Sequence, residues 1–302
     1  MEAGYASNAV LVTLTIKTWA ANAMDRSISS KVANDHGTDV KLARVWKTLV
    51  PNKKGSLLGG IYAIEREARN FHYDNTLPYK HEGQRILPTM NYAKYMEKMR
   101  TLKLRLEEEV LKFLQHWDDI KDQAREKLKG MYKDDDYPSL ERLVRAFDIS
   151  VSTDPLPKAA TFFETKLSEH EIAQAKRGLE DGLKETFRKA NEELWDRLMS
   201  CTMNLKERLN GDPKFLREAA IENANDLLDL LARLNVNNDE KLEELRKTLK
   251  DSFSGLTASA LRQDAAMREK KADEVSQIQN MMQSYMGMGF GEPDKMELKS
   301  VA

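Results

Sequence analysis

A glycine-rich segment, Lys54 to Gly60, contains the residue types closest to a phosphate-binding loop. Such loops hold phosphate groups through backbone N–H groups, but they need the order Gly-x-x-x-x-Gly-Lys-Ser/Thr after a strand. This segment has neither feature. The pair Gly59-Gly60 falls within a predicted helix, where paired glycines indicate close packing against a neighbouring segment. We therefore favour a packing role over nucleotide binding.

Side chains that bind metals or act as nucleophiles lack a recognisable spacing. The five histidines are scattered, at His36, His72, His81, His116 and His170. The sequence His170-Glu171 lacks the second histidine of a zinc-protease motif, and no Ser-His-Asp or Cys-His arrangement is evident. The run Asp134-Asp135-Asp136 could attract Mg²⁺, but three acids before a proline are typical of a solvated turn. The sequence thus favours a non-enzymatic protein without cofactor or metal.

The single cysteine, Cys201, excludes an intrachain disulfide, and its place on a helical apolar stripe predicts a buried, inert thiol. No run approaches the roughly 20 apolar residues that span a bilayer. The apolar segment Val10 to Ile16 is too short for a signal peptide and has no basic residues before it. We therefore expect a cytoplasmic protein without a membrane partner.

Charge is unevenly distributed along the 302 residues. Residues 1–105 carry 17 basic and 9 acidic side chains, a net charge of +8, whereas the remainder carries 31 and 40, a net charge of −9. Either an acidic partner binds the first part, or the two parts pair with each other. The candidate nucleic-acid contacts are the cations Lys94, Lys98, Arg100, Lys103 and Arg105, interleaved with Tyr92 and Tyr95.

A second basic region surrounds Trp46 and contains Lys41, Arg44, Lys47, Lys53 and Lys54. Cations with nearby aromatic side chains can follow a nucleic-acid backbone and stack on bases. The alternative is that both basic regions are charged, solvent-facing surfaces whose cations pair with acidic helices later in the chain.

Periodicity predicts a mainly α-helical fold with long, coiled-coil-like helices. From Thr89 to Met131 one apolar stripe repeats about every 3.6 residues, which predicts one unbroken helix. Ser168 and Glu171 form a capping box that begins a second long helix ending near Asn210. Shorter helices are predicted over residues 18–34, 39–49, 56–74, 139–146 and 239–253, with a further element from Asp212-Pro213.

Alternating β-branched residues predict two short strands, at residues 10–16 and 147–152, which could pair as a two-stranded ribbon. Residues 75–88 contain two prolines and one glycine and predict an ordered loop. We expect three regions: residues 1–88, a long-helix bundle at 89–255, and a helix-permissive to flexible tail at 256–302. The Met- and Gly-rich end of that tail is either a flexible extension or an adaptable docking peptide.

Several segments carry a family resemblance. Ala68-Arg69-Asn70-Phe71-His72-Tyr73-Asp74-Asn75-Thr76-Leu77-Pro78-Tyr79 is followed by Arg85-Ile86-Leu87-Pro88 and by Asn91-Tyr92-Ala93-Lys94-Tyr95-Met96. Supporting features are Leu14-Thr15-Ile16-x-x-Trp19, Phe147 to Val151 and Leu230 to Asn235. Over residues 10–250 the chain resembles the phage and plasmid family catalogued as domain of unknown function 3150.

The resemblance implies a bacteriophage or mobile-element product acting in the host cytoplasm, often encoded near MoxR-type AAA ATPases. It carries no catalytic role. We therefore expect an adaptor that binds such an ATPase and that self-associates through its apolar stripes. The alternative is a nucleic-acid-associated protein in phage replication, recombination or host-defence evasion. Within the motif, the candidate polar contacts are Arg69, His72, Tyr73, Asn75 and Arg85, with loop anchoring as their alternative role.

Overall fold

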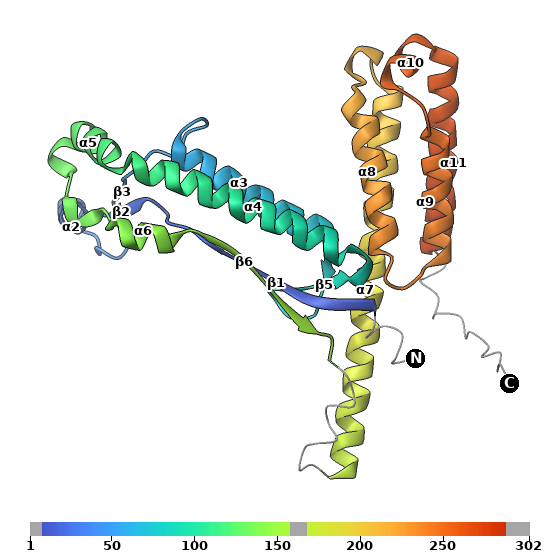
Figure 1. Cartoon of the computed structure of the whole chain (residues 1–302), viewed down its shortest axis with the longest axis horizontal. Helices are drawn as coiled ribbons and strands as arrows, with labels where there is room; N and C mark the ends of the chain where they lie inside the picture. The colour runs from blue at the N-terminus through green and yellow to red at the C-terminus, as the bar shows by residue number, and fades with distance from the viewer. Residues whose placement is uncertain (1–7, 158–167, 288–302) are drawn as a thin grey trace. The chain divides into compact units, whose positions relative to one another are not determined.

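The computed structural model describes residues 8–157 and 168–287, and its elements are labelled in Figure 1. The described chain is mainly α-helical. The helices are α2 Arg26–Asp35, α3 Leu57–Asn75, α4 Thr89–Gln115, α5 Trp117–Leu128, α6 Leu140–Ala146, α7 Glu169–Asn210, α8 Glu218–Leu234, α9 Glu240–Phe253, α10 Ala258–Gln263 and α11 Ala265–Gly287. The strands are β1 Ala9–Lys17, β2 Asn22–Met24, β3 Trp46–Thr48, β4 Leu77–Pro78, β5 Gln84–Pro88 and β6 Asp148–Pro155.

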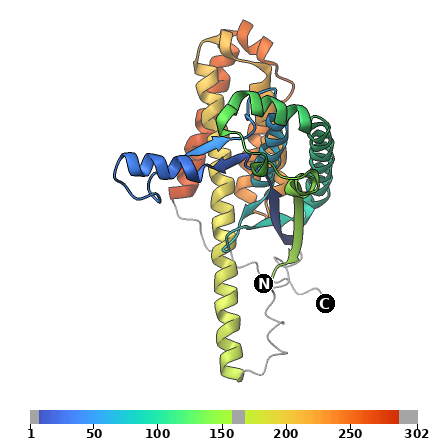
Figure 2. The same ribbon diagram turned by 90° about the vertical axis from the view of Figure 1, so that its left-hand side faces the viewer.

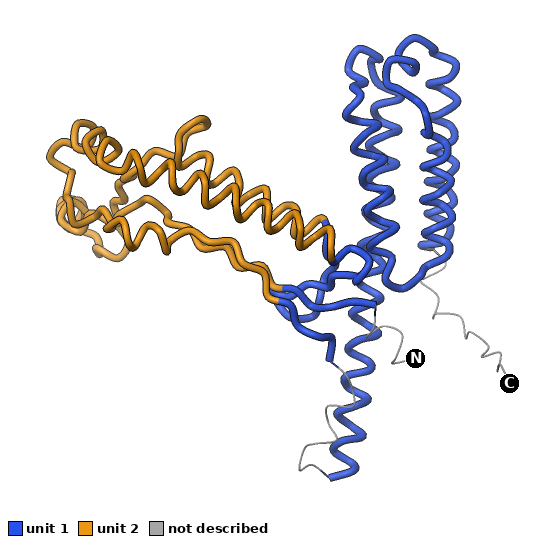
Figure 3. The backbone as a smooth tube through the Cα atoms, viewed as in Figure 1, with its two compact units in different colours: residues 1–12, 75–92, 153–302 blue, residues 13–74, 93–152 orange. Residues whose placement is uncertain are grey.

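The chain forms two compact units, coloured separately in Figure 3. Unit 1 contains residues 1–12, 75–92 and 153–302, and unit 2 contains residues 13–74 and 93–152. Each unit is therefore assembled from segments that lie both before and after residue 88. Strands β1 and β6 and helix α4 contribute residues to both units.

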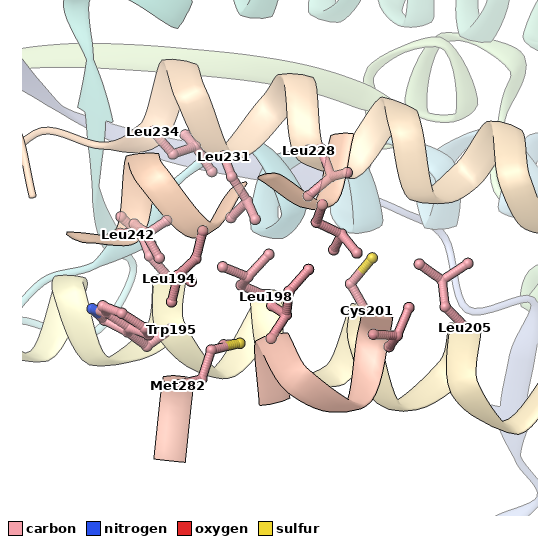
Figure 4. Packing of buried hydrophobic residues seen from close by; sticks show 14 of the residues in the cluster. Leu194, Trp195, Leu198, Cys201, Leu205, Leu228, Leu231, Leu234, Leu242 and Met282 are labelled. Atoms are coloured by element: carbon pink, nitrogen blue, oxygen red, sulfur yellow. The ribbon is translucent and has the colours of Figure 1, made fainter. Parts of the chain in front are cut away.

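Unit 1 has a leucine-rich core built around α7. Leu194, Leu198 and Leu205 of α7 face Leu228 and Leu231 of α8 (Figure 4), and all five are at most 2% exposed. Helix α11 packs along α7, and Met282 reaches the same core. The capping box is present: the Ser168 hydroxyl accepts from the Glu171 N–H, and Glu171 accepts from the Ser168 N–H at 2.8 Å. Burying each leucine contributes roughly 1.5–3 kcal/mol.

Unit 2 has an aromatic core. Phe113 and Trp117 lie 5.5 Å apart between ring centroids, and Trp19 contacts both rings. Phe147 and Tyr137 extend the cluster, and the Tyr137 hydroxyl donates to the Leu49 carbonyl at 3.2 Å. Aromatic pairs of this kind add directional packing to the area that they bury.

The four-stranded sheet has the order β4-β5-β1-β6. The strands expected at 10–16 and 147–152 are present as β1 and β6, and they are neighbours, but they belong to this larger sheet. Residues 75–88 do not form the loop that their prolines and glycine predict. They instead contain β4 and β5, which pair antiparallel with Leu77 opposite Ile86. Gly83, at φ +82°, supplies the left-handed conformation in the connection between the two strands.

One predicted helix begins too early, and another is wrong. Residues 18–34 form β2 and the shorter α2, whose N-cap is Asp25 rather than Thr18. Residues 39–49 form turns and β3. The reason is non-local hydrogen bonding: the Asp25 N–H donates to the Val45 carbonyl at 2.9 Å, and the Leu49 N–H donates to the Ala21 carbonyl at 2.8 Å. These bonds outweigh a weak local helix preference.

The helix predicted over 89–131 is divided at His116 into α4 and α5. Its apolar stripe is nevertheless buried at seven positions: Met99, Leu102, Leu106, Val110, Phe113, Trp117 and Ala124. At the other end of the chain, the helix-permissive residues after 256 form α10 and α11. Residues 288–302, which include the glycine-rich end of the expected tail, lie outside the described residues.

Replacing Leu198 by alanine should lower the free energy of unfolding by about 2–5 kcal/mol, because it leaves a cavity in the core of unit 1. The matched control is Met203→Ala on the same helix, where the side chain is 59% exposed and the change should stay within about 0.5 kcal/mol. Urea titration followed by circular dichroism measures both. Equal effects would contradict the assignment of the core.

Candidate functional site

The motif residues predicted as polar contacts are mostly engaged within the fold. In unit 2, His72 is 4% exposed and its Nδ1 lies 2.7 Å from the hydroxyl of the fully buried Tyr95. Burial raises the pKa of Tyr95 far above its usual value, so the phenol stays neutral. Arg69 is exposed on α3, and Tyr73 is 52% exposed with its ring edge-on to His72.

Asn75 and Arg85 lie in unit 1. The side-chain amide of Asn91 donates to the backbone carbonyl of Asn75 at 3.1 Å. Arg85 donates to the Thr76 hydroxyl at 2.7 Å and lies 3.5 Å from Glu193. These contacts tie the end of α3 to α4 and tie β5 to α7, as a loop-anchoring role requires.

The α4 cations are largely neutralised within unit 2. Lys98 and Arg105 both pair with Glu67, at 2.8 and 2.9 Å, and hydrogen bonds from these two cations lower the pKa of that carboxyl. Lys103 pairs with Asp148 at 3.1 Å. The paired carboxylates come from α3 and β6, not from the acidic helices later in the chain. Lys94 and Arg100 remain exposed.

A different surface carries exposed cations and apolar side chains together. Residues 22–48, which we call the arm, comprise β2, α2, the connection 36–45 and β3. Helix α2 and the connection after it project from the other elements of unit 2 (Figure 2, blue, at the left). Strands β2 and β3 pair antiparallel, with Met24 opposite Trp46. The Ser29 hydroxyl accepts from the Val45 N–H at 2.9 Å, which fixes the end of the connection against α2.

The arm is held by a buried ammonium group. Lys47 is 3% exposed, donates to the Met131 carbonyl at 2.8 Å and pairs with Asp25 and Asp136. Asp25 also caps α2, and hydrogen bonds from the Ser27 side chain and the Ile28 N–H lower its pKa to about 2. Asp25 therefore stays charged at neutral pH.

Strand alternation then places Trp46 on the opposite side. Successive side chains of a strand point to opposite faces, so burying Lys47 turns its neighbours outward. Trp46 is 60% exposed, although a tryptophan beside a lysine would ordinarily take the buried face. Two more apolar residues of the arm are exposed, Leu42 at 82% and Val40 at 41%.

The exposed cations of the arm are unpaired. Within the described ranges, no carboxylate lies within 4 Å of the charged nitrogens of Arg26, Lys31, Lys41 or Arg44. Asp39, the acidic residue nearest to Lys41 in the sequence, accepts a hydrogen bond from the Lys41 backbone N–H at 2.8 Å in a turn. The sequence placed Trp46, Lys41 and Arg44 together but did not identify Leu42 and Val40 as exposed partners.

Other candidate features of unit 2 have structural roles. At Gly59, a Cβ atom would lie 2.2 Å from the Lys53 carbonyl oxygen, so this glycine permits the close packing that the sequence predicted. A pocket of 370 Å³ is lined mainly by charged and polar side chains of α3, with Lys98 from α4. Among the residues that the structure describes, no three His, Cys, Asp or Glu side chains are placed to hold a metal ion.

Burial also raises the pKa of two further groups. Cys201 is 5% exposed, and burial raises the pKa of its thiol to about 11, as expected for an inert cysteine. Burial raises the pKa of the Glu65 carboxyl, and the Thr18 hydrogen bond and the Arg69 charge oppose this shift only in part. Its Oε1 atom has no hydrogen-bond partner in the described part of the chain.

Comparison of the chain with protein-family models, curated proteins and solved structures found no match. None of the helices within the described ranges is both long enough and apolar enough to cross a membrane.

Replacing Lys47 by methionine should lower the free energy of unfolding by about 3 kcal/mol, because Asp25 and Asp136 would lose their buried counter-ion while the side-chain volume is kept. Lys41→Met, a change at an exposed cation of the same arm, should alter it by less than about 0.5 kcal/mol. Urea titration compares the two variants. A stable Lys47→Met protein would show that the ion pairs do not hold the arm.

Glu65 makes stability depend on pH. Because its pKa is raised on folding, the stabilisation from its protonated form is present below the unfolded carboxyl pKa and is lost as pH rises through the folded value. Glu65→Gln should therefore become progressively more stable than the natural chain as pH rises from 4 to 8. Urea titrations across this range, with Glu97→Gln on exposed α4 as control, test this sign.

Proposed function

We propose that this chain is a non-enzymatic interaction protein that binds a protein partner through the arm. The observation that carries the proposal is the orientation of strand β3, which buries Lys47 and leaves Trp46 60% exposed. Tryptophan and arginine are enriched among the few residues that dominate protein–protein binding energy. The arm presents both types, in Trp46 and Arg44, with Leu42 beside them in the sequence.

An adaptor role accounts for the arrangement of the arm. Strand β3, which carries Trp46, is anchored within unit 2 by the buried ion pairs of Lys47, so this exposed side chain is positioned before a partner arrives. Presenting a preformed contact surface reduces the entropy lost on binding. The resemblance noted in the sequence implies that the first partner to test is a MoxR-type AAA ATPase.

Nucleic-acid binding is the second candidate, because Lys41 and Arg44 are exposed and unpaired within the described chain and lie close in sequence to Trp46. The ion pairs of Lys98, Lys103 and Arg105 with Glu67 and Asp148 count against the α4 surface. Binding to an oligonucleotide that weakens steeply with salt and requires Trp46 would favour this candidate over a protein partner.

Trp46→Ala should weaken binding to the partner protein by about 30-fold or more, as expected for an interface residue that contributes about 2 kcal/mol. Affinity capture of tagged protein, with nuclease added and mass spectrometry as readout, identifies the partner, and calorimetry with the purified partner measures the affinity. Phe215→Ala is the control, since Phe215 is 69% exposed in unit 1. Unchanged binding by Trp46→Ala, or capture that nuclease abolishes, contradicts the proposal.

A further inference from the structure

The distribution of charge within the arm indicates what kind of protein segment it binds. Residues 40–46 contain Lys41 and Arg44 and no acidic residue. Both cations are exposed and unpaired within the described residues, unlike Lys98, Lys103 and Arg105 on α4. The fold has therefore paired three of the five α4 cations, and it leaves Lys41 and Arg44 of the arm available, as it does Lys94 and Arg100. Charged interfaces are arranged so that opposite potentials meet.

Apolar side chains alternate with these cations along the chain. Val40, Leu42 and Trp46 are each exposed, and Leu42 at 82% has almost no protection from water. Exposed apolar clusters rimmed by polar groups mark interaction sites. A partner that matches this segment offers both apolar side chains and negative charge.

We infer that the arm binds an acidic segment of a protein partner, one in which Asp or Glu residues accompany aliphatic or aromatic side chains. The acidic groups face Lys41 and Arg44, and the apolar side chains pack against Trp46 and Leu42. This inference rests on the proposed function and adds the chemistry of the partner.

A nucleic acid fits this surface less well. Non-specific single-strand binding uses several aromatic side chains on which successive bases stack. Within the arm, Trp46 is the one aromatic residue, and the exposed aliphatic side chains of Leu42 and Val40 gain from contact with apolar groups rather than phosphates.

Selection from a library of random 16-residue displayed peptides tests the inference without knowledge of the natural partner. The bait is the full chain, and binders that also recognise the Trp46→Ala/Leu42→Ala double variant are removed. The expected result is enrichment of peptides rich in Asp and Glu that also carry aliphatic or aromatic residues. Enrichment of neutral or basic peptides, or no enrichment, would overturn the inference.

Charge reversal then tests the named cations with the most enriched peptide. Lys41→Glu/Arg44→Glu should weaken its affinity by at least about tenfold, measured by fluorescence anisotropy. The matched control is Lys53→Glu/Lys54→Glu, which reverses two exposed cations of the same unit outside the arm. Equal effects of the two double variants would show that the attraction is a general property of the unit and would reject the assignment.

Rival occupants give distinct results in the same assay. Saturable binding of a labelled 15-residue oligothymidylate, or of vesicles containing phosphatidylserine, that requires Trp46 and exceeds the affinity of the selected peptides would overturn the inference. A purified partner that needs Trp46 but is indifferent to Lys41→Glu/Arg44→Glu would overturn the acidic partner and leave the proposed function standing. Binding of the purified partner that is unchanged by Trp46→Ala would instead reject the proposed function.

Discussion

The buried ammonium of Lys47 is the interaction on which the exposed surface of the arm depends. A cation removed from water is tolerated only where carboxylates and carbonyls replace its hydration. Asp25, Asp136 and the Met131 carbonyl provide these groups, so Lys47 joins the N-terminus of α2, β3 and the turns near residue 134. The alternation of the strand then leaves Trp46 no inward position. One electrostatic requirement thus fixes both the attachment of the arm and the residues it presents to solvent.

The basic side chains of residues 1–105 include some that pair with a carboxylate and others that do not. On α4, Lys98 and Arg105 share Glu67, a partner that lies in the same part of the sequence, and Lys103 is paired with Asp148. On the arm, Lys41 and Arg44 have no carboxylate within ion-pair distance among the described residues. Internal pairing therefore accounts for only part of the asymmetry, because Lys94 and Arg100 of α4, like Lys41 and Arg44, have no carboxylate within ion-pair distance among the described residues. Proximity in sequence to aromatic residues did not separate the paired cations from the unpaired ones, because pairing is decided by neighbouring elements.

Local signals predicted the long helices well. The apolar stripe of α4 and α5 and the capping box at Ser168 depend on residues three or four positions apart, and such contacts form within one helix. The arm could not be predicted in this way. Its strands are short, and hydrogen bonds such as Asp25 N–H to Val45 carbonyl join residues 20 positions apart. The same limit explains the missed β4–β5 hairpin, where a proline-containing loop and a short strand have similar sequences.

The exposure of Trp46 could not be inferred from its neighbours, because Trp46-Lys47-Thr48 fits a strand in either orientation. The usual orientation buries the tryptophan. The observed orientation is selected by the contacts of Lys47 with Met131 and Asp136, which lie 84 and 89 residues after Lys47 in the chain. A small polar residue at position 46 would pair equally well in β3 and would not expose an indole to water. Trp46 contributes little to the core in this orientation, because most of its surface stays in contact with water.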